Sequence, residues 1–107
     1  MYNLDVLRTA SYYERVIRSF RSRDAELIFN GRYSKRFDRI AQVIETKLVQ
    51  IHAALLLSDL TIFPGNRLEA LKGSRAGQHS IRINDKYRIC FIWRDGDAFE
   101  VEITDYH

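Results

Sequence analysis

The spacing of apolar residues changes from a helical to an alternating period near Arg67, and this change constrains the fold more than any other feature. Before it, apolar residues recur every three or four positions, which predicts a long helix over about Ser34–Leu57. After it, apolar and polar residues alternate, which predicts strands. Helices followed by strands linked by short turns predict an α+β domain, with N-terminal helices packed on one face of a small antiparallel sheet.

Shorter elements complete this prediction. Val16–Phe20 is interpreted as a short first strand, and Asp24–Phe29 as a short helix that Gly31 ends. Leu68–Lys72 is a further candidate strand, followed by a loop over Gly73–Gly77. Three alternating strands follow, around residues 80–84, 87–94 and 99–104.

Length and composition exclude several classes of protein. A chain of 107 residues fits one domain, and 46% hydrophobic residues can supply its core. The charged fraction of 29%, with no apolar stretch near the roughly 20 residues of a membrane span, argues against a membrane protein. No signal peptide is recognisable, so we expect a cytoplasmic protein. The single cysteine, Cys90, excludes an internal disulfide, and no spacing suggests a metal site or other cofactor.

Positive charge is concentrated in the second half of the chain. Between Arg67 and Arg94, only Glu69 and Asp85 oppose a series of lysines and arginines, although the whole chain carries a net charge of only +3. Such a block is typical of a protein that binds a polyanion such as nucleic acid. A solvated basic surface remains the alternative.

Strand register predicts which polar side chains meet. With three-residue turns at 84–86 and 95–97, the apolar residues share one face, and Arg82 lies opposite Arg88 on the other. The same register places Thr104 beside Arg88 and Tyr106 one diagonal step away. Two arginines directly opposite repel each other unless an anion lies between them. An ordinary surface ladder of ion pairs with Glu100 and Glu102 is the alternative.

The chain resembles the HigB toxins of the RelE/ParE superfamily, and especially their GraT-like branch. The resemblance covers Val16 to His107 and rests on VIRSF, on PGNRLEALKGSRAGQHSIRINDKYRICFIW and on the ending VEITDYH. It implies a toxin domain over residues 16–107, preceded by an extension over residues 1–15 without a catalytic duty. In a rival interpretation, Tyr12 and Tyr13 pack on the helices.

The resemblance also implies an activity and its partners. HigB toxins of this kind cleave messenger RNA in the ribosomal A site without a metal or other cofactor. A cognate HigA-type helix-turn-helix antitoxin neutralises the toxin, and operator DNA is bound only through that complex. A ParE-like inhibitor of DNA gyrase, or a non-toxic relative that only binds an antitoxin, are the competing functions on the same fold.

Site residues follow by matching to the family. Arg88 matches the arginine thought to stabilise the scissile phosphate, and Tyr106 the near-terminal tyrosine that contacts the RNA. Asp105 and His107 flank Tyr106 in the ending DYH, and His107 is a candidate for acid–base work because histidine titrates near neutral pH. Lys72 matches a basic loop position that some relatives keep, and Glu69 stands where some relatives have a histidine. Arg75 and Arg82 are not matched to the family; we expect them, with Lys72, to extend the positive surface around the phosphate.

Two histidines have structural interpretations instead. His52 lies in the predicted long helix, where a structural or exposed role is expected. His79 shares the parity of the apolar face, which favours a place in the core or at its edge.

Overall fold

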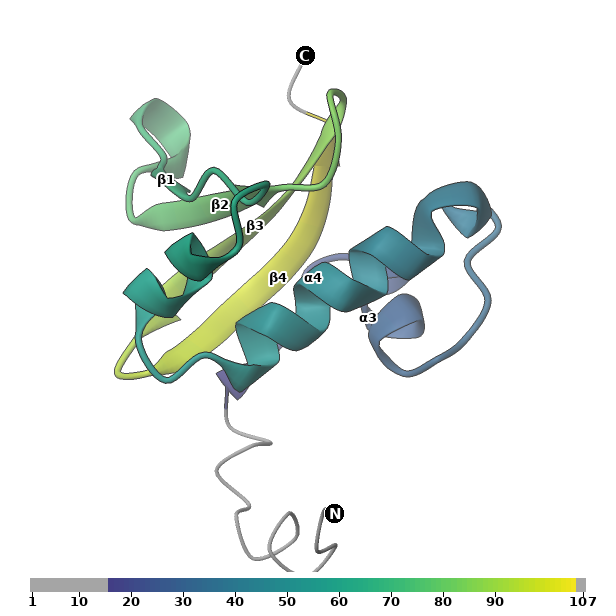
Figure 1. Ribbon diagram of the computed structural model, residues 1–107, viewed down its shortest axis with the longest axis horizontal. Coiled ribbons are helices and arrows are strands. Elements are labelled where there is room, and N and C mark those ends of the chain that lie inside the picture. The colour runs from purple at the N-terminus through teal and green to yellow at the C-terminus, as the bar shows by residue number, and fades with distance from the viewer. Residues whose placement is uncertain (1–15, 106–107) are drawn as a thin grey trace, which may run out of the picture.

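Helices precede strands in the computed structural model of this chain, which describes residues 16–105 (Figure 1). The sheet is antiparallel with the strand order β1-β2-β3-β4, and the predicted α+β class is confirmed. Residues 1–15, 106 and 107 lie outside the described part, so the predicted extension stays a prediction. The elements are α3 (Arg23–Phe29), η1 (Asp38–Ile40), α4 (Ala41–Ala53), η2 (Leu57–Ile62), β1 (Glu69–Ala70), η3 (Gly73–Arg75), β2 (Gln78–Arg82), β3 (Tyr87–Arg94) and β4 (Asp97–Asp105).

The core lies between α4 and one face of the sheet. On α4, Ile44, Leu48 and Ile51 are fully buried, at the three- and four-residue spacing of one helix face. They belong to the same cluster as Ile89 and Phe91 of β3, the central side chains of the apolar sheet face. Burying each such side chain contributes roughly 1.5–3 kcal/mol, so this contact stabilises the packing of α4 on the sheet.

The long helix predicted over Ser34–Leu57 is wrong at both ends. α4 begins only at Ala41, after a 3-10 turn, and Ala54 leaves the helix with an extended backbone. Asp59 favours that exit, because its carboxylate accepts the backbone N–H groups of Leu55 and Leu56. Within residues 16–105, no helix is long and apolar enough to cross a membrane.

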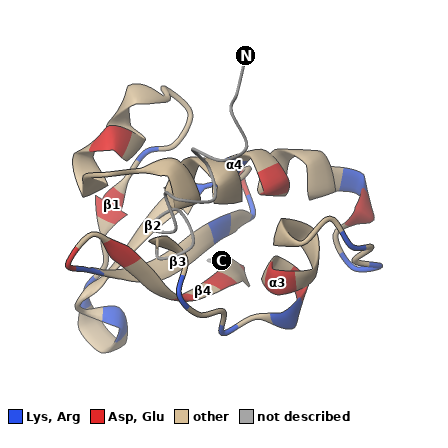
Figure 2. Ribbon diagram, turned by 90° about the horizontal axis from the view of Figure 1, so that it is seen from below, with Lys and Arg blue, Asp and Glu red and all other residues tan. Residues whose placement is uncertain are grey.

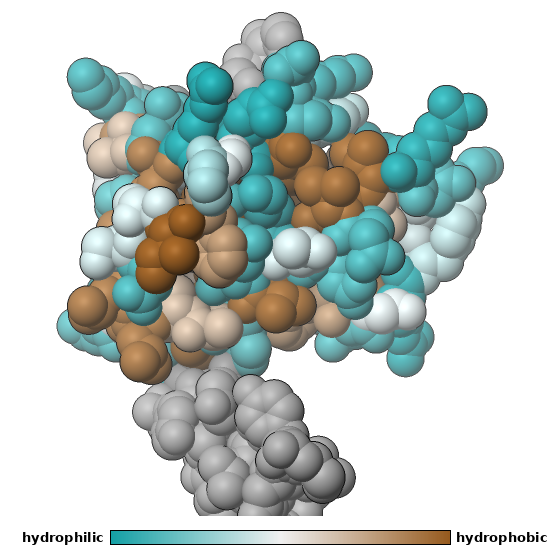
Figure 3. Space-filling model, viewed as in Figure 1, coloured by the Kyte–Doolittle hydropathy of each residue, from teal (hydrophilic) through white to brown (hydrophobic). Residues whose placement is uncertain are grey.

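Exposed apolar side chains gather where α4 ends and η2 begins. They are seen at the left of Figure 3, and next to them lies a groove of about 450 Å³ between α4 and η2. This exposed patch consists of Val49, Leu55, Leu56, Ile62 and Phe63. Leu55 continues the apolar spacing of α4 beyond the end of the helix, which is why the sequence predicted a longer helix.

The register predicted for β2 and β3 is confirmed. Ile81 pairs with Ile89 and Arg82 with Arg88, as the apolar pattern requires. The carboxamide oxygen of Asn84 closes the turn by accepting two backbone N–H groups, so the turn is held by its own side chain.

The register predicted for β3 and β4 is right at one end and wrong at the other. Arg88 faces Thr104 as expected, but the turn has two residues, Asp95 and Gly96, rather than three. Both have positive φ, 53° and 82°, as a type I′ turn requires. A β-bulge at Glu100, whose φ is 54°, absorbs the extra residue.

The bulge changes which side chains of β4 reach the core. Ala98 is fully buried opposite Trp93, whereas Phe99 pairs with Ile92 on the other face and lies under the guanidinium of Arg94. The prediction of a three-residue turn failed because it assumed an uninterrupted period of two.

Residues 16–22 run along the free edge of β4 instead of forming a regular first strand. Two isolated parallel bridges, Ile17 with Ala98 and Phe20 with Val101, join this segment to β4. Ser19 fits the bulge, since its hydroxyl accepts the N–H of Glu100 and donates to the carboxylate of that residue. The predicted strand is therefore only partly formed.

A buried asparagine ties three parts of the fold together. Asn66 is fully buried, its oxygen Oδ1 accepts from the Lys47 ammonium, and its Nδ2 donates to Gln50 Oε1 and the Leu60 carbonyl, both at 3.0 Å. Its carbonyl accepts the N–H of Arg82 at 2.6 Å. Burial, and then the charge of Arg82, lower the pKa of Lys47. Asn66 therefore links α4, η2 and β2.

Replacing this asparagine tests that link. We expect Asn66→Ala to lower the free energy of unfolding by about 2–3 kcal/mol, because it leaves buried polar groups of α4 and η2 without partners. Chemical denaturation measures the change. Asn30→Ala, which removes one exposed hydrogen bond to Glu26, should change stability by less than about 0.5 kcal/mol. Equal effects of the two substitutions would contradict the role given to Asn66.

Candidate functional site

Arg88 lies near the start of β3, on the sheet face that is turned away from α4. Its Nε donates to Ser80 Oγ at 2.7 Å, and its Nη2 donates to the Arg67 carbonyl at 2.6 Å and the Ser80 carbonyl at 3.2 Å. The carboxylate of Glu69 lies 3.9 Å from Nε. Acceptors from β1, β2 and the segment before β1 therefore fix the plane of the guanidinium.

The guanidinium is more enclosed than the sequence suggests. The register places Arg82 and Arg88 on the face away from the apolar side chains, yet Arg88 has only 7% of its surface exposed. Ser80 beneath it is fully buried, although it lies on the polar side of β2. A buried charge is tolerated only with good hydrogen-bond partners, and the three contacts to Ser80 and Arg67 supply them.

Arg82 lies opposite Arg88, as predicted, and its own charge is partly balanced. Its Nη2 is 2.5 Å from the carboxylate of Asp85 in the following turn. Asp85 is almost fully exposed, so its ion pair with Arg82 is weak and another anion can displace the carboxylate. On β4, Thr104 pairs with Arg88, and its buried hydroxyl has no hydrogen-bond partner among residues 16–105. Arg82 and Thr104 therefore add donors beside Arg88.

The remaining predicted residues fall into two groups. Glu69 joins the Arg88 cluster, and Lys72 is exposed at the start of η3, three positions further along the chain. Arg75 lies elsewhere on the same face, where it contacts Gln78 and Glu102. The structure therefore brings Glu69 and Arg82 to Arg88, while Arg75 belongs to a second cluster.

The end of the chain is only partly described. Asp105 is the last described residue, pairs with Tyr87 across the sheet and lies 3.9 Å from the Lys86 ammonium. Tyr106 and His107 lie outside the described residues, so the predicted approach of Tyr106 to Arg88 stays a prediction. β4 continues to Asp105, so the strand carries the chain to the Arg82 end of the β2–β3 hairpin.

Two expectations about histidines are met. His52 accepts the N–H of Ile17 at 3.4 Å and packs edge-on against Phe29, which is a structural role. His79 stacks on Phe91 at the edge of the core. Among residues 16–105, no group of three or more His, Cys, Asp or Glu side chains could hold a metal ion.

Sequence reasoning missed three residues of this sheet face. Ser80 and Arg67 supply the acceptors for Arg88, and Arg21 reaches the face from the segment before α3, 3.8 Å from Glu102. The alternation of β2 did place Ser80 on the polar face, so its position could have been found. The positive φ of Arg67, 46°, and the path of Arg21 depend on tertiary contacts that no local pattern reports.

Charge on this sheet face is mixed rather than uniformly basic (Figure 2). The charged residues of β3 are basic and those of β4 are acidic, and Glu102 of β4 contacts both Arg21 and Arg75. Positive groups are thus held in fixed positions by acidic neighbours and protein carbonyls. A fixed guanidinium can bind two oxygens of a phosphate with little loss of side-chain entropy.

The sequence is similar to those of known toxins. Residues 18–107 match the family described as the RelE-like toxin of the type II toxin–antitoxin system HigB. The toxin HigB-1 of Vibrio cholerae is 48% identical over 67 residues, which are 63% of this chain and 70% of that protein. The endoribonuclease HigB of Proteus vulgaris is 31% identical over 99 residues, 86% of this chain and 100% of that protein. The chain therefore belongs to the HigB family of RelE-like toxins of type II toxin–antitoxin systems.

Proposed function

We propose that the chain is a ribosome-dependent endoribonuclease that cuts messenger RNA in the A site by attack of a 2′-OH group on the adjacent phosphate. The similarity to a protein named as an endoribonuclease along its whole length supports this activity. The observation that carries it is the fixed guanidinium of Arg88 on the polar sheet face. We place the chain in the GraT-like branch on the resemblance that extends from VIRSF to the ending VEITDYH, and we place its action in the cytoplasm with the ribosome.

Arg88 stabilises the additional negative charge that forms on phosphorus as the 2′-oxygen attacks. Preorganised positive charge is generally the largest protein contribution to such a step, and an arginine keeps its proton throughout. Before RNA binds, Glu69 balances part of the Arg88 charge at 3.9 Å. The Glu69 side chain is 58% exposed, so a phosphate can replace it at little cost.

Neighbouring charges extend the binding surface for RNA. Arg82 contacts an adjacent phosphate by exchanging its exposed partner Asp85 for the RNA. Lys72 reaches the RNA from the exposed turn after β1, and Arg75 contacts it further along the sheet. Released from Arg88, the carboxylate of Glu69 becomes available to accept the proton of the 2′-OH.

The end of the chain supplies the remaining groups. Tyr106 stacks on or orients a base, as aromatic side chains commonly do with unpaired RNA. His107 donates the proton to the 5′-oxygen that leaves, or accepts the 2′ proton, with Asp105 next to it in the sequence as the alternative carboxylate. The ribosome contributes by holding the messenger in the conformation that the attack requires.

A type II toxin implies a cognate antitoxin. We propose a helix-turn-helix protein of the HigA type, which also connects the toxin to operator DNA. In this proposal RNA binds to the polar sheet face. An antitoxin that binds another face of the toxin therefore neutralises it by keeping the toxin out of the ribosome. The activity needs no membrane and no cofactor.

The role of Arg88 is tested by mapping messenger ends on programmed ribosomes. We expect Arg88→Ala to lower the cleavage rate by about 10²–10³-fold, as when a donor to a transition-state oxyanion is removed. Arg88→Lys should restore little, because a lysine lacks the planar fork that binds both Ser80 and a phosphate. Arg94→Ala is the matched control at the far end of β3. Normal cuts with Arg88→Ala, or gyrase poisoning with intact messengers, would contradict the proposal.

Ser80 is a positioning residue in this account. Removing its hydroxyl with Ser80→Ala should lower stability by about 1–2 kcal/mol, because it removes the Nε acceptor of a buried charge. It should also lower kcat more than it raises KM, since Arg88 is then less well placed in the transition state. Ser58→Ala, at an exposed position of η2, serves as the control. A stability loss with unchanged kcat would restrict Ser80 to a structural role.

His107 is tested by the dependence of the single-turnover rate on pH. The wild-type profile should bend near neutral pH, where histidine changes charge, and His107→Asn should remove that bend. Tyr106→Phe keeps the stacking ring and should leave the bend in place. A bend that persists in His107→Asn would assign the proton transfer to a carboxylate instead.

A further inference from the structure

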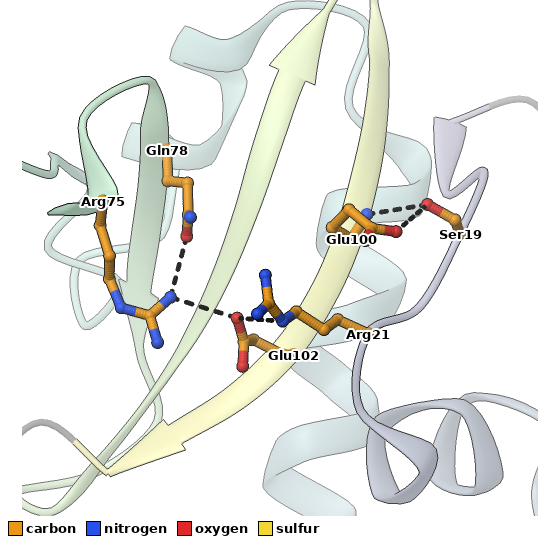
Figure 4. A network of polar contacts seen from close by, with 6 residues as sticks. All are labelled: Ser19, Arg21, Arg75, Gln78, Glu100 and Glu102. Carbon is orange, nitrogen blue, oxygen red and sulfur yellow. Dashed lines mark hydrogen bonds and ion pairs between the residues drawn. The ribbon is translucent and has the colours of Figure 1, made fainter.

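Two arginines from distant parts of the sequence converge on one carboxylate of β4. Arg21 Nε lies 3.8 Å and Arg75 Nη1 lies 3.1 Å from the same oxygen, Oε2 of Glu102 (Figure 4). Arg75 Nη1 also donates to Gln78 Oε1 at 3.0 Å. The figure shows the two guanidinium groups approaching Glu102 from opposite sides, over the polar face of the sheet.

The backbone explains why Arg21 reaches this position. Ser19 binds the bulged Glu100 with its hydroxyl, and Arg21 N donates to the carbonyl of Val101 at 2.9 Å. These contacts fix the segment alongside β4 and direct Arg21 over Glu102. On the other side, the short η3 turn carries Arg75 toward the same residue. The convergence is thus built into the fold.

The cluster has more positive charge than it needs to balance Glu102. Two guanidinium groups and one carboxylate leave an excess of one positive charge. The side chain of Glu102 is only 16% exposed, whereas those of Arg21 and Arg75 are 64% and 36% exposed. A polar cavity of about 200 Å³ opens between the arginines and is lined by Arg21, Ser74, Arg75 and Gln78. Its lining offers donors to an oxyanion.

The cluster lies close to Arg88 on the same sheet face. Glu102 pairs with Cys90, which follows Arg88 by two positions on β3. Residues two apart on a strand point to the same face and lie about 7 Å apart. Consecutive phosphates of an extended RNA strand are separated by a comparable distance, so one RNA strand can reach both places.

We propose that Arg21 and Arg75 form a second phosphate-binding site, which holds the RNA backbone one or two nucleotides from the phosphate at Arg88. In the free protein Glu102 holds the two guanidinium groups near each other, and the phosphate binds on their exposed side. The inference rests on the proposed function, since it assumes that RNA lies across this sheet face. The phosphate belongs either to the messenger or to ribosomal RNA.

The salt dependence of binding tests the site directly. The probe is a 2′-O-methyl oligoribonucleotide, which cannot be cleaved, titrated against the full chain at several salt concentrations. Each of Arg21→Gln and Arg75→Gln should weaken binding on the order of fivefold and reduce the slope of log K against log salt by about 0.7, the value for one phosphate contact on a single strand. Arg18→Gln is the matched control, because Arg18 precedes Arg21 in the same segment and pairs with Asp97.

Glu102→Gln separates a binding site from a purely structural ion pair. If the arginines bind phosphate, removing the competing carboxylate should raise RNA affinity severalfold, even if the protein loses some stability. If the arginines serve only to hold β4 and η3 together, affinity should stay unchanged or fall in Glu102→Gln. Unchanged slopes in both arginine variants, together with unchanged or lower affinity in Glu102→Gln, would exclude messenger RNA as the ligand of this site. Normal binding of the same variants to ribosomes as well would overturn the proposal.

Two further measurements identify the RNA and separate this proposal from the proposed function. Weaker binding of the variants to the oligoribonucleotide assigns the site to messenger RNA, whereas weaker binding only to ribosomes without messenger assigns it to ribosomal RNA. On programmed ribosomes, Arg21→Gln should raise KM and leave kcat unchanged. If Arg88→Ala stops cleavage while both arginine variants bind and cleave normally, the second site is wrong and the nuclease function stands. Cleavage that survives Arg88→Ala would instead reject the catalytic proposal.

Discussion

The polar face of the sheet depends on a buried positive charge. Moving a guanidinium out of water costs several kcal/mol unless acceptors in the protein replace the lost water. Ser80 and the carbonyl of Arg67 do this for Arg88, and each comes from a different part of the chain. Because these acceptors fix the guanidinium, a phosphate that reaches it meets a donor already in place. Little reorganisation is then required when charge develops during cleavage.

One irregularity of the sheet organises the rest of that face. The bulge at Glu100 sends Ala98 into the core and Phe99 to the polar face, and it receives the hydroxyl of Ser19. The segment before α3 is thereby fixed along β4, with Arg21 over Glu102. β-Bulges often redirect side chains next to functional sites. Here one bulge fixes the segment before α3 beside the sheet face that we propose binds RNA.

The sequence allowed much of the fold to be predicted, because long alternating segments leave few choices of register. Pairing of Arg82 with Arg88 and of Arg88 with Thr104 followed from keeping apolar residues on one face. The two-residue turn at Asp95 was not predicted, because the β-bulge interrupts the alternation of β4 and the alternating pattern does not show where a bulge lies. The ends of α4 were missed because exposed apolar residues such as Leu55 continued the helical spacing past the point where Asp59 ends the helix.

The candidate site was predictable in its residue types but not in its environment. Alternation placed Arg88, Arg82 and Glu102 on one face, yet it gave no sign that Arg88 would be enclosed or that Arg67 would turn a carbonyl toward it. Arg21 lies 81 positions before Glu102, and only the folded chain brings them together. The family resemblance contributed Tyr106 and His107, for which the alternating pattern alone gives no chemical role.

The central claim is that the Arg88 guanidinium binds the phosphate that is cut. Its most direct test is a structure of the chain on a ribosome programmed with a messenger that carries a 2′-O-methyl group at the cleavage site. Our account predicts the scissile phosphate within hydrogen-bond distance of the Arg88 guanidinium, with Glu69 moved away and Ser80 still in contact. A scissile phosphate on another face of the domain, with Arg88 still enclosed by Glu69, Ser80 and Arg67, would contradict it.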